Sequence, residues 1–268
     1  MSTGNIGLRP STAIVKSVGD LVDFISKRLT TNRTAADSGI LWFRGHRSRA
    51  WDVGPSIWRD YDKDAERNFT NRFCVRAATR YQSLPSYDQD ALWLSLMQHY
   101  GLPTRLLDWT RSPLVAAYFA VEDYIFDQSR EPEDALIWIL DPHVLNKSEG
   151  FKDVTPSIEA HMCKQMIAAA FTHEIEENQK ILAVMAAEND LRMFVQQGCF
   201  TIHSDTVPLN QRAEHQAYLS ALIVPAIHVR RLAFEIDACG FRRGDIFPDL
   251  EHLAEELKGT YPPRKKHP

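Results

Sequence analysis

The segment that decides the fold lies near the middle of the chain and runs Gln98-His99-Tyr100-Gly101-Leu102-Pro103-Thr104-Arg105-Leu106-Leu107-Asp108-Trp109-Thr110. We expect a helix over 90–100 before it, stopped by Gly101 and Pro103, because glycine suits the residue after a helix and proline cannot continue one. Another helix is expected after it, since Ser112 is a good N-cap and Pro113 suits a first turn. The segment is therefore predicted to be a loop between two helices that displays polar groups, as binding loops do.

Hydrophobic periodicity extends this pattern in both directions along the chain. Further helices are expected from Val18 after the cap Ser17, over 62–81, through most of 150–180, and over 190–196, 226–239 and 250–258. Strands are expected over 40–43, 135–140, 181–185, 199–203 and 219–224. This mixture predicts an α+β fold.

Length and composition favour one folding unit. The chain has 268 residues, of which 44% are hydrophobic and 25% charged, as in an ordinary globular protein with a full core. We see no internal repeat and no biased linker, so we expect a flexible lead-in over 1–15, a single domain over 16–260 and a basic tail over 261–268. The net charge of −4 gives no global sign of nucleic-acid binding, although a local basic groove stays possible.

The four cysteines are far apart and form no Cys-x-x-Cys pair, so we interpret them as reduced thiols. The first twelve residues lack the apolar stretch of a signal peptide, and no window is apolar enough to span a bilayer. A cytoplasmic protein without membrane contact is expected. The histidines show no metal-binding spacing on one helix, so no metal site is expected.

Two further segments carry chemistry-bearing side chains. Arg44 follows a predicted buried strand, where its planar fork suits phosphate or carboxylate, and Gly45 lets a ligand or another backbone approach closely. Pairing of Arg44 with a core acid is the structural alternative. Gln196 and Gln197 stand at a helix-to-strand turn, where their amides either bind a ligand or satisfy backbone groups. In the long segment, an ion pair between Arg105 and Asp108 is the corresponding alternative.

At these segments the chain resembles the FRG domain family, for which Phe43-Arg44-Gly45 is the name-giving motif. The resemblance covers residues 20–258. It continues through 98–110 and then through 112–120, 196–200 and 246–250.

A more distant resemblance links the chain to the ADP-ribosyltransferase superfamily, and it implies a split β-sheet core surrounded by helices. Three motifs follow in order in that superfamily: a strand ending in Arg, a Ser-Thr-Ser-like strand leading into a helix, and a turn with a catalytic Glu. Arg44-Gly45, Trp109-Thr110-Arg111-Ser112 and Gln196-Gln197-Gly198 are similar to these three in position.

The resemblance implies NAD as co-substrate, and it assigns catalytic roles to Arg44, Thr110, Gln197 and Asp108. Arg44 is expected to hold the pyrophosphate and Thr110 to orient the nicotinamide ribose or Arg44. NAD contacts are expected from the following residues: Arg44, Gly45, Gln98, His99, Arg105, Trp109 and Tyr118, with Trp109 or Tyr118 stacking on the nicotinamide.

The third motif departs from the superfamily because Gln197 stands where the Glu is expected, and an amide cannot act as a general base. Either Asp108 or Glu122 supplies a carboxylate, or the acceptor needs no base, or NAD is bound without turnover. The resemblance therefore implies an ADP-ribosyltransferase-like bacterial toxin or phage-defence effector that modifies a macromolecule and has a cognate antitoxin.

Nucleic acid is favoured slightly over protein as acceptor because of arginines near the first motif: Arg47, Arg49, Arg59, Arg72, Arg76 and Arg80. The first alternative is a non-catalytic NAD- or nucleotide-binding regulatory module. The second is a metal-dependent hydrolase or nuclease that uses Asp108 and Glu122.

Overall fold

The structure, a computed structural model, describes residues 13–31, 41–81, 84–127, 129–187 and 191–261. Most of the expected lead-in, position 40 of the expected strand and nearly all of the basic tail lie outside these residues. The chain forms two compact units, each built from separated segments. Unit 1 comprises Met1–Trp51, Ser112–Leu140 and Leu219–Pro268, and unit 2 comprises Asp52–Arg111 and Asp141–Tyr218. We describe each unit by itself.

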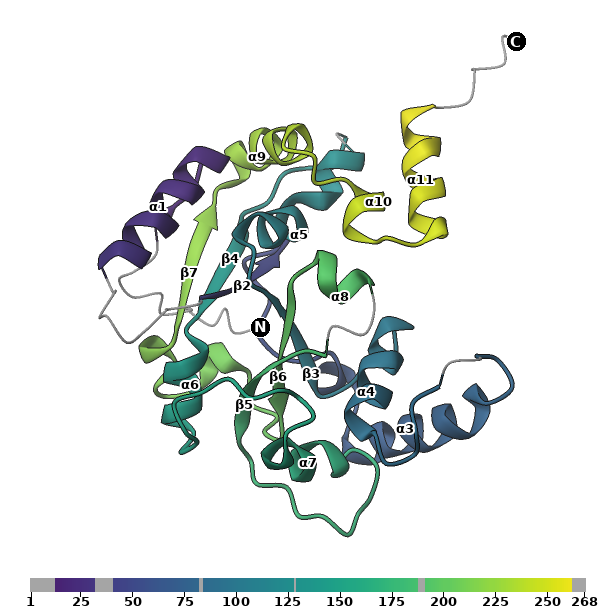
Figure 1. Ribbon diagram of the computed structural model, residues 1–268. Coiled ribbons are helices and arrows are strands. Elements are labelled where there is room, and N and C mark those ends of the chain that lie inside the picture. The colour runs from purple at the N-terminus through teal and green to yellow at the C-terminus, as the bar shows by residue number, and fades with distance from the viewer. Residues whose placement is uncertain (1–12, 32–40, 82–83, 128, 188–190, 262–268) are drawn as a thin grey trace, which may run out of the picture. The chain divides into compact units, whose positions relative to one another are not determined.

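Unit 1 is a four-stranded sheet with helices packed on it (Figure 1). The strand order is β1 (Ala13–Ile14), β7 (Leu219–Val224), β4 (Ala135–Leu140) and β2 (Trp42–His46), with β1 parallel to β7 and the other pairs antiparallel. Its helices are α1 (Val18–Thr31), α5 (Pro113–Phe126), α9 (Ala226–Ala238), α10 (Arg243–Ile246) and α11 (Leu250–Thr260). The core lies between the sheet and α1, α5 and α9.

Helix α5 forms where the sequence predicts it and packs unusually close to β2. The Ser112 side chain accepts a hydrogen bond from the Val115 backbone, and Pro113 occupies the first turn. A Cβ on Gly45 would lie 2.0 Å from the Ala116 carbonyl oxygen and 2.6 Å from the Ala120 nitrogen. Only glycine therefore lets the α5 backbone approach the strand this closely.

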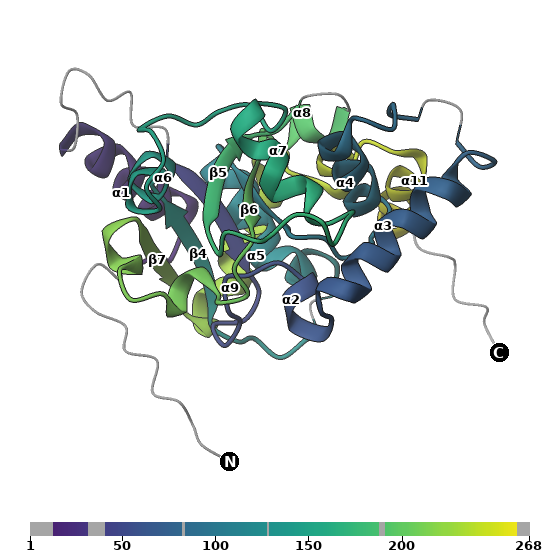
Figure 2. The same ribbon diagram turned by 90° about the horizontal axis from the view of Figure 1, so that it is seen from below.

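Unit 2 contains an antiparallel sheet of β3 (Leu106–Thr110), β6 (Gly198–His203) and β5 (Ile181–Met185), in that order. Its helices are α2 (Ile57–Asp60), α3 (Lys63–Ala77), α4 (Asp90–His99), α6 (Pro142–Ser148), α7 (His161–Ala168) and α8 (Leu191–Val195). Helices α4 and α7 cover one face of this sheet (Figure 2). Apolar side chains of these helices and of the three strands form the unit's main core.

The α+β class is confirmed, and most expected elements are present at close to the expected boundaries. The helix stops follow the punctuation of the sequence: Gly101 and Gly240 follow α4 and α9 closely with φ of 81° and 87°, in the region that favours glycine.

Two expectations are wrong. Residues 106–110 form β3 rather than loop, because Leu106, Leu107, Trp109 and Thr110 are all buried and pair with β6. Between 150 and 180 the only helix is α7, and much of that region is irregular. In the part of the chain that the structure describes, no helix is long and apolar enough to cross a membrane.

Candidate functional site

Arg44 lies in the middle of β2, on the face opposite α5. It pairs across the sheet with Trp138 of β4, and strand alternation places His46 on the same face. Arg44 is partly exposed, whereas His46 is 2% exposed and Trp138 is 6% exposed. Trp51 packs edge-on against His46, with ring centroids 5.9 Å apart. On this face of unit 1, the Arg44 guanidinium therefore lies beside the His46 imidazole and the Trp138 indole.

His46 lies between two hydrogen-bond donors. Arg44 Nε is 3.2 Å from His46 Nε2, and Trp138 Nε1 is 3.2 Å from His46 Nδ1. A neutral imidazole has one nitrogen that accepts and one that donates, so His46 accepts from only one of the two at a time. The tautomer of His46 thus decides whether it orients the Arg44 guanidinium.

Gly45 and Tyr118 were expected to contact NAD, but the core of unit 1 accounts for both. Gly45 faces the α5 backbone, so helix packing explains the glycine without a ligand. Tyr118 is 0% exposed within the core cluster, and its pKa is raised, mainly by burial. The expectation that Tyr118 stacks on nicotinamide is therefore wrong for this conformation.

Asp108 is the exposed residue of β3, and the end of α4 holds it. Gln98 Nε2 donates to Asp108 Oδ2 at 2.6 Å, and Thr104 Oγ1 donates to Gln98 Oε1 at 2.9 Å. His99 is exposed at the end of α4, edge-on to Tyr100. Three predicted site residues, Gln98, His99 and Asp108, thus lie near one another in unit 2, and Asp108 is the exposed one of the five residues of β3.

The second and third motifs meet although they are far apart in sequence. Thr110 Oγ1 donates to the Gln196 carbonyl oxygen at 2.6 Å, and the Arg111 backbone donates to the Gln197 carbonyl oxygen at 3.1 Å. Gln197 has a φ of 49°, which is uncommon for a residue other than glycine, and its side chain is exposed. The turn before β6 is therefore tied to the end of β3.

Arg105 was expected to bind NAD, and this expectation is wrong. Its side chain is 0% exposed, and its guanidinium donates to Glu66 Oε2 at 2.6 and 3.0 Å. It also donates to the Met166 carbonyl oxygen and to both carboxylate oxygens of Glu177. All guanidinium nitrogens are engaged inside unit 2, so Arg105 is structural, and its partners are glutamates rather than Asp108.

Trp109 is also buried rather than available for stacking. It is 3% exposed, and its Nε1 donates to Thr201 Oγ1 at 3.0 Å. Thr201 Oγ1 in turn lies 2.8 Å from Nε2 of His203, which is fully buried. This chain of polar contacts fixes β3 to β6.

Two of the arginines near the first motif, Arg47 and Arg49, lie beside carboxylates. Arg47 forms an ion pair with Asp123 at 2.8 Å, and Arg49 lies 3.7 Å from Asp134. The second candidate carboxylate, Glu122, lies 3.8 Å from Arg47, and burial raises its pKa. Glu122 therefore resembles a structural carboxylate of unit 1 more closely than Asp108 does.

Sequence reasoning missed the roles of His46, Trp138, Glu66 and Thr201. The first two lie on neighbouring strands, and the last two pair with residues 39 and 92 positions away. The sequence signals available for the side chains around Arg44 were a histidine two residues further along and a tryptophan in another predicted strand. Among the described residues, no group of three or more His, Cys, Asp or Glu side chains is placed to hold a metal ion.

Residues 39–129, which include β2, β3 and α5, match the profile of the FRG domain family. The chain contains an FRG domain. The match is narrower than the expected 20–258 and leaves the Gln196-Gln197 turn outside it. No curated protein and no solved structure matches the chain.

Proposed function

We propose that this FRG protein binds NAD and acts as an ADP-ribosyltransferase-like effector, of the toxin or phage-defence kind, that modifies a macromolecule. The observation that carries the proposal is the contact between Thr110 and Gln196 at 2.6 Å. It joins the segments that resemble the second and third ADP-ribosyltransferase motifs, which are 86 residues apart. Such a contact is expected when two motifs serve one site.

Arg44 supports the same proposal from the first motif. It lies on a rigid strand, is partly exposed, and has its Nε side beside His46. An arginine oriented in this way suits the bidentate recognition of a pyrophosphate. Of the residues expected to contact NAD, those that remain compatible with ligand contact are Arg44, Gln98 and His99, because Arg105, Trp109 and Tyr118 are buried.

The transfer would break the bond between the nicotinamide nitrogen and ribose C1′. Nicotinamide leaves with the bonding electron pair, and a lone pair of the acceptor forms the new bond to C1′. The acceptor's proton then passes to a carboxylate or to solvent, and the exposed Asp108 is the better placed of the two candidate carboxylates for solvent access. Thr110 and Gln197 would orient the ribose and do not need to accept a proton.

A second candidate function is supported by Gln197 itself. An amide at the third motif orients a hydroxyl but is no general base, so a module that binds NAD without turnover fits this turn equally well. The two candidates differ in one observable, the release of nicotinamide.

Calorimetric titration of NAD tests both candidates at their common step. We expect saturable binding by the natural chain, loss of binding in Arg44→Ala, and a strong loss in Arg44→Lys because lysine lacks the bidentate fork. Arg49→Ala is the matched control, since Arg49 lies in the same segment but pairs with the exposed Asp134. Unchanged binding in a folded Arg44→Ala variant would remove Arg44 from the site.

A further inference from the structure

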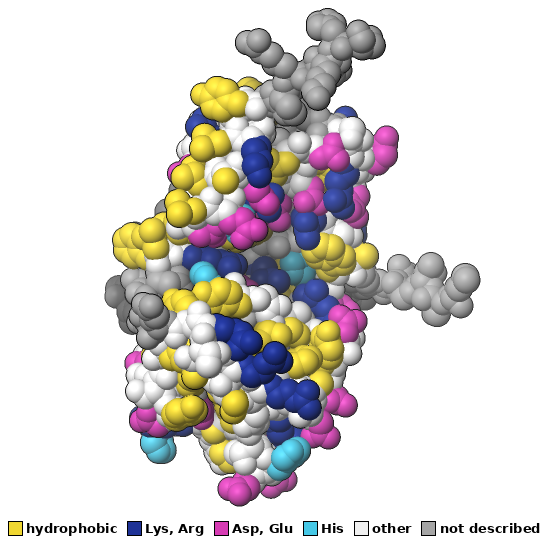
Figure 3. Space-filling model, turned by 90° about the vertical axis from the view of Figure 1, so that its right-hand side faces the viewer, with side chains coloured by type: hydrophobic (Ala, Val, Ile, Leu, Met, Phe, Trp, Pro, Cys, Tyr) yellow, Lys and Arg dark blue, Asp and Glu magenta, His cyan; other side chains and the backbone are white. Residues whose placement is uncertain are grey.

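Helices α3 and α4 of unit 2 enclose a groove that no residue of the proposed NAD site lines. Its volume is about 490 Å³, and aromatic and arginine side chains alternate along it. Its lining includes Phe69, Phe73, Tyr81 and Tyr100, interleaved with Arg72, Arg76 and Arg80. Figure 3 shows Lys and Arg side chains in a row beside hydrophobic ones on the face that carries α3 and α4.

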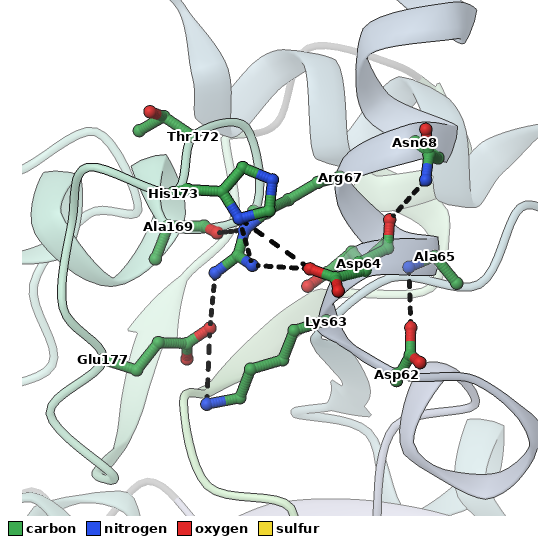
Figure 4. A network of polar contacts seen from close by, with 12 residues as sticks. Asp62, Lys63, Asp64, Ala65, Arg67, Asn68, Ala169, Thr172, His173 and Glu177 are labelled. Atoms are coloured by element: carbon green, nitrogen blue, oxygen red, sulfur yellow. Dashed lines mark hydrogen bonds and ion pairs between the residues drawn. The ribbon is translucent and has the colours of Figure 1, made fainter.

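The arginines of this groove differ from Arg67, which lies nearer the start of α3. Arg67 is surrounded by acceptors: Asp64 at 3.1 Å, the Ala169 carbonyl oxygen at 3.1 Å and Glu177 at 3.8 Å (Figure 4). By contrast, Arg72, Arg76 and Arg80 form no ion pair with any residue in the described part of the chain. Arg80 hydrogen-bonds to the Arg76 carbonyl oxygen and to Thr79, at the end of α3. The groove therefore has an unneutralised positive rim on a protein whose net charge is −4.

The spacing of the arginines suits a linear polyanion. Residues four apart on a helix lie on one face about 6 Å apart along the axis. Arg72 and Arg76 are such a pair on α3, and Arg80 follows shortly after the helix ends at Ala77, so the three can contact successive phosphates of an extended strand. A continuous positive line beside an apolar groove is the arrangement used for single-stranded nucleic acids, in which the backbone follows the charges and the bases stack on aromatic rings.

The tyrosines provide the exposed aromatic surface. Tyr81 is 42% exposed and Tyr100 is 55% exposed, and their rings pack edge to face with centroids 6.0 Å apart. A base stacks on such rings without needing polar partners in the groove. Duplex DNA or RNA keeps its base faces inside the helix, so it can use the arginines but not the tyrosines.

We infer that the α3–α4 groove binds single-stranded nucleic acid, with phosphates on Arg72 and Arg76 and at least one base stacked on Tyr81 or Tyr100. This binding does not require NAD, so it stands apart from the proposed transferase activity. For the proposed transferase activity, the groove of unit 2 would then bind the acceptor, a single-stranded nucleic acid.

Fluorescence polarisation without NAD tests the inference, with labelled single-stranded RNA, single-stranded DNA, the matching duplex and polyglutamate as probes. We expect at least one of the two single-stranded probes, RNA or DNA, to bind more tightly than the duplex. If Arg72 and Arg76 each contact a phosphate, the logarithm of the binding constant should fall with the logarithm of salt concentration with a slope of about −1.4. The two single-stranded probes distinguish RNA from DNA as the natural ligand.

Matched variants separate charge from stacking. Arg72→Gln and Arg76→Gln should each reduce the salt slope by about 0.7. Tyr100→Ala should weaken binding by roughly 5- to 150-fold and leave the slope unchanged, as expected for the loss of one stacked base. Lys152→Gln removes an exposed charge of the same unit outside the groove and should change neither quantity.

Several outcomes would overturn the inference. If neither single-stranded RNA nor single-stranded DNA bound at low salt, the groove would not be a nucleic-acid site. Equal or tighter binding of the duplex, or equal competition by polyglutamate, would show a site for polyanions or acidic proteins rather than for bases. Full affinity in both arginine variants would place any binding elsewhere. None of these results depends on whether nicotinamide is released.

Discussion

The buried pair between Glu66 and Arg105 gives the sharpest test of how unit 2 is held together. Both side chains are 0% exposed, and the Glu66 carboxylate accepts from the Arg105 backbone at 2.8 Å and from its guanidinium at 2.6 and 3.0 Å. Glu66→Gln keeps the shape but removes the charge, and it turns an NH₂ group toward guanidinium donors. Breaking a buried pair costs about 3–5 kcal/mol, and we expect the lower end because Glu177 still contacts Arg105.

Urea unfolding followed by tryptophan fluorescence measures this loss as a lower midpoint at unchanged slope. Asp64→Asn, which breaks an exposed pair on the same helix, is the control and should cost at most about 1 kcal/mol. The double variant Glu66→Leu/Arg105→Met should recover most of the loss, since apolar side chains can replace a buried pair. If Glu66→Gln cost no more than Asp64→Asn, Arg105 would not be held as described, and it would again be a candidate for binding NAD.

Three further predictions follow from packing and burial. Gly45→Ala should lower the unfolding temperature severely or prevent folding, because its Cβ would lie 2.0 Å from the Ala116 carbonyl oxygen. The control Gly259→Ala, with open space around it, should stabilise α11 slightly, and thermal melts give the unfolding temperature of each variant. Dithiobisnitrobenzoate at about pH 8 should titrate one thiol in the folded protein, the exposed Cys239, and four after denaturation, and fast reaction of a second thiol would contradict the burial of the others. Burial raises the pKa of Glu122, so the folded state keeps this proton to higher pH than the unfolded chain, and the free energy of unfolding should fall as pH rises between the unfolded and the folded pKa. Urea titrations at several pH values should show a weaker pH dependence of this free energy in Glu122→Gln. An identical pH dependence in the two proteins would refute the assignment.

Local signals in the sequence predicted the helix boundaries well. Ser112 and Pro113 begin α5, and Gly101 and Gly240 follow closely after α4 and α9, because caps and left-handed glycines act within a few residues. The strand β3 was missed for the opposite reason. Its sequence lacks the apolar–polar alternation of a half-buried strand, since four of its five residues are buried.

Long-range features could not be predicted from one sequence. Arg105 looked like a ligand-binding arginine because nothing near it in sequence is its partner; Glu66 lies 39 residues earlier. The two units are likewise invisible in the composition, because each is assembled from separated segments and no biased linker marks their boundaries. The contact of Thr110 with Gln196 was not predicted either, because the two residues lie 86 positions apart in the sequence.

One measurement tests the proposed NAD chemistry most directly. The purified protein is incubated with NAD labelled in the adenosine part, alone and with separate pools of cellular protein, RNA and DNA, while nicotinamide release and label transfer are followed. The proposal predicts nicotinamide release with label on one macromolecular pool, nucleic acid being favoured, and loss of both signals in Arg44→Ala. If NAD binds but no nicotinamide is released with any pool, Gln197 marks a binding module, and the transferase proposal is wrong.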